Sequence, residues 1–215
     1  METIILEESK KIKLFKRFES KYIIQQSLIH NIFNYCEDNY LIVEDNNNFD
    51  FPYYSLYFDT DKLDMIKAHE NNDLIRQKLR IREYYNGDKY LEIKEKNNHQ
   101  TNKIRIPVIS YEINNEKNWI TSNLIYDTKN LSKTLEVKYN RITLLSKDKS
   151  NRITFDFDIN FKNYKTDKEY KIDKNIIIEV KKNSENNIDI EDYLNNLGIF
   201  KEKFSKYHYG MKKTS

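Results

Sequence analysis

Within the stretch Ile75–Tyr85, basic side chains occupy every second position from Arg76 to Arg82, and this spacing is the clearest chemical signal in the sequence. In a β-strand, successive side chains point to opposite faces of the sheet. A strand here would place Arg76, Lys78, Arg80 and Arg82 on one face and mainly apolar residues on the other. Cations that share one face repel each other, so we expect an anionic partner to compensate them.

Two kinds of partner are consistent with this ladder of cations. The first is a set of acidic residues on neighbouring strands, which would make the ladder an ordinary solvated sheet face. The second is phosphate, because the guanidinium group of arginine binds two phosphate oxygens at once and lysine adds a point charge. The rest of the sequence has to distinguish these explanations.

The composition favours a single folded domain over residues 1–215. Hydrophobic residues make up 38% of the chain and charged residues 33%, but 17 Tyr and 11 Phe supply the aromatic side chains of a packed core. The formal net charge is only +3, so general attraction to nucleic acid or to an anionic membrane is weak. Any anion binding must therefore come from local clusters of charge.

The residues that are scarce exclude several kinds of site. With only three Gly there is no glycine-rich loop to hold phosphate with backbone amides, so side chains must do this. Cys36 is the only cysteine and is expected to be a helical core residue in a cytoplasmic protein, because it can form no internal disulfide. The N-terminal residues are too charged for a signal peptide, and no run of 18 apolar residues predicts a transmembrane segment.

Alternating patterns predict an α+β fold with many antiparallel strands and few helices. An Asn-Gly pair at residues 86–87 follows the ladder and is a strong hairpin signal. The next two strands, residues 90–96 and 103–106, again pair one apolar face with one charged face. Further strands are expected at residues 53–58, 135–145, 152–159 and 176–181, and helices at residues 23–35, at 188–197 and up to His69, the last capped by Asp59 or Thr60.

Several carboxylates share faces with these bases, namely Glu19, Glu92, Glu136, Asp156 and Glu179. A carboxylate that faces phosphate is reasonable when a divalent cation lies between them. A groove for nucleic acid would instead carry basic and aromatic residues with few acids. The mixture favours a site for a triphosphate and a metal ion, in a wide β-barrel, over nucleic-acid binding.

Eight short motifs occur in order along nearly the whole chain. They are Arg17-x-Glu19-x-Lys21-Tyr22, Ser55-x-Tyr57-Phe58-Asp59-Thr60, Arg76-x-Lys78-x-Arg80-Ile81-Arg82-x-Tyr84, Leu91-Glu92-Ile93-Lys94-x-Lys96, Lys138-Tyr139-x-Arg141, Arg152-Ile153-Thr154-x-Asp156, Ile178-Glu179-Val180-Lys181 and Phe204-Ser205-Lys206-Tyr207. Together they resemble the VTC domain, the polyphosphate polymerase domain of the vacuolar transporter chaperone complex and its bacterial relatives, in the triphosphate tunnel metalloenzyme superfamily. The CYTH branch of that superfamily opens with Glu-x-Glu-x-Lys, so Arg17 disfavours a CYTH-type triphosphatase or adenylate cyclase.

The resemblance implies a closed antiparallel β-barrel tunnel with flanking helices, in which a nucleoside triphosphate binds with Mn²⁺ or Mg²⁺ as cofactor. The residues it implies for catalysis are Lys21, Arg80, Arg82, Lys94, Arg141 and Lys206. Those expected to add to ATP binding are Arg76, Lys78, Arg152 and Lys181, of which Arg76 and Lys78 join the tunnel face by strand parity. Glu179 is the implied metal ligand.

The implied function is transfer of the γ-phosphate of ATP to a growing inorganic polyphosphate chain. Two other functions stay open, namely hydrolysis of tripolyphosphate or a nucleoside triphosphate by the same residues, and non-catalytic binding of polyphosphate. The membrane spans of the family are not found in this sequence, so we expect any link to a membrane to need a separate partner protein.

The roles of several other charged residues also stay open. Glu19, Glu92, Glu136 and Asp156 could each orient a neighbouring base or touch the metal. The lysines between residues 162 and 174 could form a solvated loop or guide a polyphosphate chain. His208 is a further candidate for phosphate contact.

Overall fold

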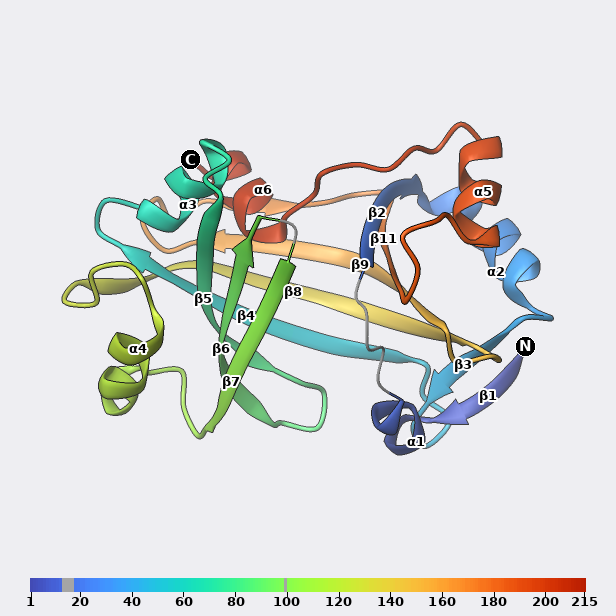
Figure 1. Cartoon of the computed structure of the whole chain (residues 1–215), viewed down its shortest axis with the longest axis horizontal. Coiled ribbons are helices and arrows are strands. Elements are labelled where there is room, and N and C mark those ends of the chain that lie inside the picture. Colours follow the sequence, from blue (N-terminus) through green and yellow to red (C-terminus); the bar gives the residue numbers. More distant parts are fainter. Residues whose placement is uncertain (13–17, 99) are drawn as a thin grey trace. The chain divides into compact units, whose positions relative to one another are not determined.

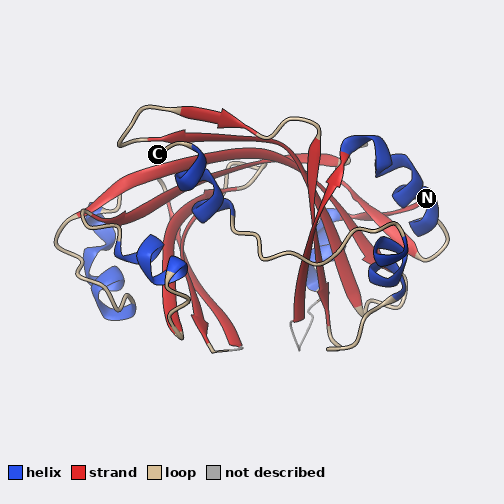
Figure 2. Cartoon of the chain, turned by 90° about the horizontal axis from the view of Figure 1, so that it is seen from above, coloured by secondary structure: helices blue, strands red, loops and turns tan. Residues whose placement is uncertain are grey.

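The computed structural model describes residues 1–12, 18–98 and 100–215 and shows an α+β fold with long strands and short helices (Figure 1 and Figure 2). The strands are β1 Glu2–Ile5, β2 Phe18–Gln25, β3 Tyr40–Glu44, β4 Asp50–Thr60, β5 Ile75–Glu83, β6 Lys89–Asn97, β7 Gln100–Val108, β8 Leu131–Ser146, β9 Asn151–Asn163, β10 Glu169–Lys171 and β11 Asn175–Lys182. The helices are α1 Leu6–Lys11, α2 Ile29–Cys36, α3 Asp64–Glu70, α4 Lys117–Asn123, α5 Asp189–Asn196 and α6 Lys206–Lys213. Arg17, which opens the first motif, lies outside the described residues.

Hydrogen bonds join the strands in the order β2-β11-β9-β8-β4-β5-β6-β7, and β3 and β10 pair with β8 and β9. Strand β11 pairs antiparallel with β2 and β9, the pairs β4–β5, β5–β6 and β6–β7 are also antiparallel, as are β3–β8 and β9–β10, and β1 pairs parallel with β3. The predicted large antiparallel sheet is confirmed, but the predicted closed barrel is wrong, because the sheet of the described residues ends at β2 and β7. β7 has the character of an edge strand: residues 100–105 are all exposed, and Lys103, Arg105 and Pro107 disfavour pairing with a further strand.

The chain forms two compact units. Unit 1 comprises Met1–Pro52, Tyr139–Ile159 and Ile172–Phe204, and unit 2 comprises Tyr53–Lys138, Asn160–Lys171 and Ser205–Ser215. The strands β4, β8 and β9 contribute residues to both units, so the boundaries do not fall in linkers. That residues 1–215 act as one domain stays a prediction.

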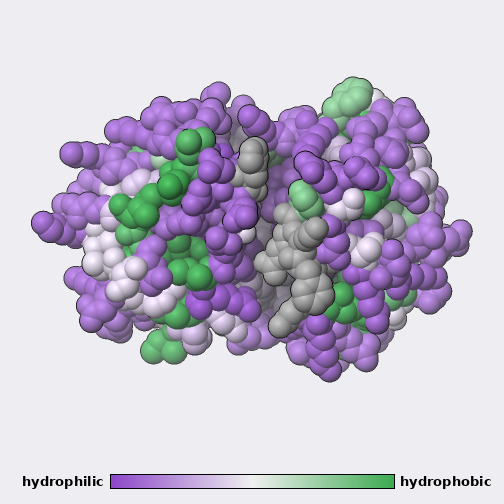
Figure 3. All heavy atoms as spheres, in the orientation of Figure 1, coloured by the Kyte–Doolittle hydropathy of each residue, from purple (hydrophilic) through white to green (hydrophobic). Residues whose placement is uncertain are grey.

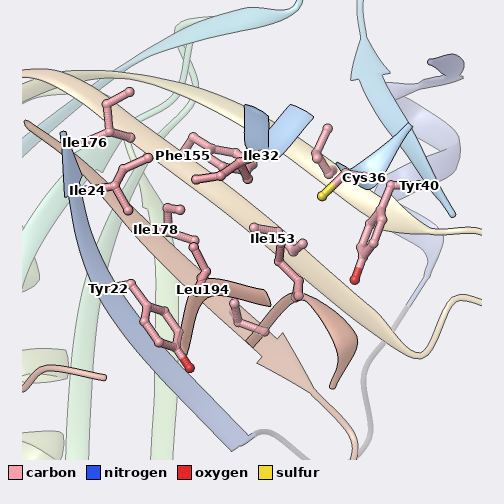
Figure 4. Packing of buried hydrophobic residues seen from close by; sticks show 13 residues of the cluster. Tyr22, Ile24, Ile32, Cys36, Tyr40, Ile153, Phe155, Ile176, Ile178 and Leu194 are labelled. Atoms are coloured by element: carbon pink, nitrogen blue, oxygen red, sulfur yellow. The ribbon is translucent and has the colours of Figure 1, made fainter. Parts of the chain in front are cut away.

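Unit 1 is built around apolar side chains that alternate along β2, β9 and β11. Ile178 of β11 lies opposite Tyr22 on one neighbouring strand and opposite Phe155 on the other, and all three are almost fully buried. Figure 4 shows Ile32 and Cys36 of α2 in the same cluster. Burial of apolar surface at about 25 cal/mol per Å² is the main force that holds these elements together. Burial also raises the pKa of the Cys36 thiol to about 12, as suits a core residue.

Unit 2 contains the predicted hairpin of β5 and β6, followed by a second hairpin of β6 and β7. Gly87 sits in the first turn with a φ of 84°, a conformation that glycine adopts without strain. The apolar faces of β5 and β6 bury Leu79, Ile81, Leu91 and Ile93. The basic residues of the ladder therefore lie together on the opposite face.

The visible surface is mainly hydrophilic, with hydrophobic atoms gathered over the region where Figure 1 has β5 to β7 and α4 (Figure 3). Exposed apolar residues of unit 2 include Ile75, Ile104 and Ile125. Among the described residues, no helix combines the length and the apolar character needed to cross a membrane.

The prediction that Asp59 and Thr60 accept hydrogen bonds from the start of α3 is confirmed, although the N-cap position itself is Leu63. The carboxylate of Asp59 accepts hydrogen bonds from the backbone N–H groups of Met65 at 3.0 Å and Ile66 at 3.2 Å. The hydroxyl of Thr60 accepts one from the N–H of Asp64 at 3.1 Å. These acceptors satisfy the first-turn amides, and the helix begins at Asp64 for that reason.

The C-terminal helix α6 was not predicted, because its segment carries a glycine and lacks a clear apolar stripe. Ser205 caps it, since its hydroxyl accepts from the N–H of His208 at 3.4 Å. Gly210 allows the helix to pack closely: an added Cβ would lie 2.4 Å from the ring of Phe161 and 2.6 Å from the side chain of Leu135.

We predict that Gly210→Ala lowers the free energy of unfolding by about 1–3 kcal/mol, the usual effect of overpacking a core. Phe161 is 2% exposed and has little room to move away from the new methyl group. Urea unfolding followed by circular dichroism measures the change. Lys212→Ala, at an exposed position of α6, is the matched control, and equal stability of Gly210→Ala and wild type would contradict this packing.

Candidate functional site

The register of β5, β6 and β7 arranges the charged residues of unit 2 in rows across the sheet. One row consists of Lys78, Lys94 and Lys103, and the adjacent row consists of Arg80, Glu92 and Arg105. Residues directly opposite each other on antiparallel strands have Cβ atoms about 4.5–5.5 Å apart. The fold thus places three lysines side by side.

On this face, β5, β6 and β7 carry more cations than acidic residues. On the charged face β5 carries four cations and β6 and β7 carry two each, whereas Glu92 is the one acid on that face among the described residues of these strands. Lys78 lies opposite Lys94, and Arg76 lies opposite Lys96. Like charges in these positions destabilise a sheet, so a solvated face with acidic cross-strand partners does not describe this register.

Glu92 lies at the centre of this face and is fully buried. Its Oε2 accepts hydrogen bonds from Nε and Nη2 of Arg80 at 2.9 and 2.7 Å, and its Oε1 accepts one from Nζ of Lys103 at 3.0 Å. Burial acts to raise the pKa of Glu92, but the charges of Arg80, Arg82 and Lys103 outweigh it and hold the pKa well below its usual value. Partial burial of the Lys103 ammonium group, together with the charges of Arg80 and Arg82, lowers its pKa to about 8, although the nearby carboxylate opposes this shift.

Strand β4 adds hydroxyl groups to the same face. Tyr57 lies opposite Arg80, and Ser55 lies opposite Arg82. Nη1 of Arg80 donates to the Tyr57 hydroxyl at 3.1 Å, and Nε of Arg82 donates to the Ser55 hydroxyl at 3.3 Å. Burial acts to raise the pKa of Tyr57, but the charges of Arg80 and Arg82 lower it overall. The two predicted arginines are therefore fixed on one strongly positive surface.

Helix α6 brings two further polar residues to this surface. The Ser205 hydroxyl accepts a hydrogen bond from Nζ of Lys78 at 2.7 Å. The charge of Lys206 also contributes to the lowered pKa of Tyr57. Tyr207 anchors the start of the helix, because its ring stacks on that of Tyr57 with the centroids 4.6 Å apart. Lys78 and Lys206, distant in sequence, thus belong to one part of unit 2.

The side chain of His208 has partners on α3. Its Nε2 lies 3.5 Å from a carboxylate oxygen of Glu70, and its ring lies 4.9 Å from the ring of His69. This arrangement adds no support to a phosphate contact by His208, which stays a prediction.

In unit 1 the predicted metal ligand Glu179 lies among bases and one other acid. The pairing of β11 with β2 places Glu179 opposite Lys21, and Lys181 opposite Glu19. Glu179, whose side chain is 13% exposed, contacts Nζ of Lys181 at 2.6 Å, and Glu19 contacts Nζ of Lys21 at 3.0 Å. Lys21 also donates to the carbonyl of Phe204 at 3.0 Å. The two carboxylates are therefore diagonal neighbours on one face.

The arginines of unit 1 have different partners. Nε and Nη2 of Arg141 donate to the two carboxylate oxygens of Asp156 at 2.5 and 2.8 Å, and Asp156 is fully buried. Nη2 of Arg152 donates to the carbonyl of Ser9 in α1 at 2.8 Å. Asp156 thus orients a neighbouring base, whereas phosphate binding by either arginine stays a prediction.

The structure divides the predicted residues between the two units. Unit 2 contains Arg76, Lys78, Arg80, Arg82, Lys94 and Lys206, and unit 1 contains Lys21, Arg141, Arg152, Glu179 and Lys181. Lys103, Tyr57 and Ser205 were not among the predicted site residues, although Tyr57 and Ser205 belong to two of the eight motifs. The parity of the third strand could have indicated Lys103, but the other two required the pairing of β4 with β5 and the position of α6.

The carboxylates of Glu179 and Glu19 in unit 1 suit a divalent metal ion that is bound by phosphate oxygens as well. Mg²⁺ is usually held by one or two carboxylates together with phosphate oxygens. Glu179 and Glu19 supply two carboxylates, and the described part of the chain contains no group of three or more His, Cys, Asp or Glu side chains placed to hold a metal. Mn²⁺ or Mg²⁺ would therefore need phosphate oxygens to complete its coordination here.

The remaining charged residues have local partners. Glu136 contacts Nζ of Lys138 at 2.6 Å and accepts a hydrogen bond from the hydroxyl of Tyr54 at 3.0 Å. In the lysine-rich connection, Lys162 lies 3.2 Å from a carboxylate oxygen of Asp167. These contacts fit a solvated hairpin, and a guiding function for polyphosphate gains no support from them.

Comparison with known proteins gives one family and one fold. The sequence matches the profile described as VTC domain over residues 16–215. A search of curated proteins finds no match. The structure resembles three solved structures at low sequence identity, which shows a shared fold alone.

The first of these structures, from Pyrococcus horikoshii, is 15% identical with a TM-score of 0.54, over 91% of this chain and 96% of that one. A candidate adenylate cyclase from Bacillus halodurans is 13% identical with a TM-score of 0.60, over 88% and 94% of the two chains. A candidate adenylyl cyclase from Hippeastrum, described as having a dominant triphosphatase activity, is also 13% identical with a TM-score of 0.60, over 93% and 97%. The fold is that of the triphosphate tunnel proteins.

We predict that Asp156→Ala destabilises the protein by about 3–5 kcal/mol, because removal of one partner of a buried ion pair leaves the other charge buried without it. Chemical unfolding measures the loss. The double variant Asp156→Ala/Arg141→Met should recover part of the stability, since it removes both charges. A loss below about 1 kcal/mol for the single variant would contradict a buried pair.

We also predict that binding of tripolyphosphate weakens as the pH rises through about 8, because Lys103 is protonated below its lowered pKa and neutral above it. Calorimetry at about pH 7 and about pH 9 measures the affinity. Lys103→Met should bind tripolyphosphate several-fold more weakly than wild type at about pH 7, and its affinity should change much less between the two pH values. Tripolyphosphate itself changes its charge with pH, but this effect is the same for wild type and variant and cancels when the two are compared at each pH. An unchanged pH dependence in Lys103→Met would show that this lysine does not contribute.

Proposed function

Because the chain belongs to the VTC domain family, we propose that it is a polyphosphate polymerase that transfers the γ-phosphate of ATP to a growing chain of inorganic polyphosphate. Its substrates would be ATP and polyphosphate or orthophosphate, with Mn²⁺ or Mg²⁺ as cofactor. Residues 1–215 would act as one cytoplasmic domain, and any membrane association would depend on a separate protein.

The observation that carries this proposal is the row of Lys78, Lys94 and Lys103 beside the row of Arg80 and Arg105. These cations lie opposite one another with one carboxylate among them, and a polyanion is the ligand that best compensates such a surface. Lysine and arginine both bind phosphate oxygens, and a linear triphosphate can contact several rows at once.

The reaction is an in-line phosphoryl transfer. A terminal oxygen of the acceptor phosphate attacks the γ-phosphorus of ATP, a new P–O bond forms, and the bond from the γ-phosphorus to the bridging oxygen breaks to release ADP. Such a transfer needs little covalent chemistry from the protein, since positioning and charge stabilisation provide most of the acceleration.

The side chains would divide this work as follows. In unit 2, Arg80, Arg82 and Lys94 would hold phosphate groups of ATP, with Arg76 and Lys78 adding to the binding. In unit 1, Arg141 would bind phosphate, with Arg152 and Lys181 adding to it. Lys21 and Lys206 would position the acceptor or the transferred phosphate, and Glu179 would hold the metal. A bound Mn²⁺ or Mg²⁺ would supply further stabilisation of the charge that develops on the phosphate oxygens.

Hydrolysis is the second candidate, because the similar structure from Hippeastrum is described as having a dominant triphosphatase activity. Water would then replace the acceptor phosphate, and the same side chains could serve. Non-catalytic binding of polyphosphate is the third candidate and requires only the basic face.

Incubation with ATP and Mn²⁺ distinguishes these functions when polyphosphate and free phosphate are measured separately. Polymer with little free phosphate is the expected result. Free phosphate alone would replace the proposal with hydrolysis, and binding of polyphosphate without either product would replace it with a binding function.

We predict that Lys94→Ala and Arg80→Ala each reduce kcat/KM for ATP by about 10²-fold or more, the usual loss when a charged group that stabilises a transition state is removed. Circular dichroism checks that each variant is folded. Lys129→Ala, an exposed lysine of unit 2 away from this face, is the control and should retain full activity. Full activity in both Lys94→Ala and Arg80→Ala would refute the assignment of this face.

A further inference from the structure

We propose that Glu92 is a positioning residue, which fixes Arg80 and Lys103 in the orientation that binds phosphate and does not itself ligate the metal. This inference rests on the proposed function, because it concerns the same basic face of unit 2. It assigns one of two roles that the sequence left open for this carboxylate.

The hydrogen bonds of Glu92 suit a residue that holds its neighbours in place. Both carboxylate oxygens accept hydrogen bonds from cations, with Arg80 on Oε2 and Lys103 on Oε1. The Tyr84 hydroxyl lies 3.5 Å from Oε1 as a weaker partner. The carboxylate is 0% exposed, whereas the side chains of Arg80 and Lys103 are 14% and 31% exposed. The Glu92 carboxylate is thus buried, whereas the two cations that it orients, Arg80 and Lys103, reach solvent.

Two bonds to one carboxylate also fix the plane of the Arg80 guanidinium. Its Nε and Nη2 both donate to Oε2 of Glu92, while Nη1 donates to the hydroxyl of Tyr57 on the other neighbouring strand. An arginine that is held from two sides loses less conformational entropy when it binds a ligand than one that is mobile. This gain in preorganisation is available only while Glu92 is ionised, and its strongly lowered pKa keeps it so near neutral pH.

A metal on Glu92 would conflict with these contacts. The cation would have to displace Arg80 or Lys103 from an oxygen and would then lie close to their charges. Repulsion between cations at such short range is unfavourable even with partial solvent screening. Glu179, by contrast, contacts Nζ of Lys181 at 2.6 Å, and the side chain of this lysine is 33% exposed.

The variants Glu92→Gln and Glu92→Asp separate positioning from the effect of charge alone. Removal of a negative charge should by itself strengthen anion binding, whereas loss of positioning should weaken it. We expect both variants to bind tripolyphosphate about tenfold more weakly than wild type in calorimetry without metal. Equal or tighter binding by Glu92→Gln would overturn the proposal.

Glu95→Gln is the matched control. This residue lies on the same strand but on the opposite face, where it accepts a hydrogen bond from Nε2 of Gln77 at 2.8 Å. It should bind tripolyphosphate like wild type. The same measurements with Mn²⁺ test the second part of the proposal: a defect of equal size with and without Mn²⁺ supports positioning, and a defect that appears only with Mn²⁺ would show that Glu92 is a metal ligand.

Titration of Lys103 by nuclear magnetic resonance of ¹³C-labelled lysine gives a readout that needs no substrate, with Lys103→Met to assign the signal. Glu92 raises the pKa of Lys103, so the pKa should fall in Glu92→Gln, and an unchanged pKa would overturn the proposal. If wild type binds no tripolyphosphate, the proposed function fails, and this titration alone decides whether Glu92 holds Lys103. If Glu92→Gln does not fold, Glu92→Asp provides both measurements.

Discussion

Repulsion among the cations of β5, β6 and β7 is the constraint to which the rest of unit 2 responds. The register sets Lys78, Lys94 and Lys103 directly side by side, and sheets normally avoid such rows. This repulsion lowers the free energy of unfolding. Burial of apolar side chains on the opposite face, where Leu79 and Leu91 are fully buried, offsets the loss. A strand pair selected for stability alone would alternate the signs of charge across it, so this register is consistent with the anion binding that we propose.

A second constraint is the position of α6, which must present its first residues to the same surface. The hydroxyl of Tyr207 donates to Asp59 at 2.9 Å and lies 3.0 Å from the hydroxyl of Thr134, and all three residues are buried. Asp59 also caps α3, so one carboxylate fixes two helices. The absence of a β-carbon at Gly210 lets the helix approach the sheet closely. The place of Ser205 therefore depends on contacts made by other residues.

The sequence was informative where periodicity and local chemistry decide the structure. Strand parity correctly separated the two faces of β5 and β6, the Asn-Gly pair located the hairpin turn, and Asp59 and Thr60 were correctly predicted to accept from the first-turn amides of α3. Parity cannot show which residue of one strand lies opposite which residue of another, so the rows of lysines and the central position of Glu92 became visible only with the register.

The open sheet and α6 illustrate what local patterns cannot supply. Closure depends on pairing between strands that are distant in sequence, and the alternation along β7 is the same for an edge strand and for an interior one. Helix α6 is short and holds a glycine, and it is stabilised by the tertiary contacts of Tyr207 and Gly210 more than by its own propensity.

The carboxylates near the bases fall into two chemical groups, and this difference bears on which of them could hold a metal. Glu92 and Asp156 are fully buried, and each is bound by two N–H groups of an arginine, a rigid partner that always stays charged. Glu179 and Glu19 have side chains that are 13% and 25% exposed and contact lysines. A lysine ammonium is a hydrated charge on a flexible stem and can move to a phosphate when a metal replaces it at the carboxylate. The first group is therefore suited to orient arginines, and under the proposed function the second group would be suited to exchange a lysine for a divalent metal.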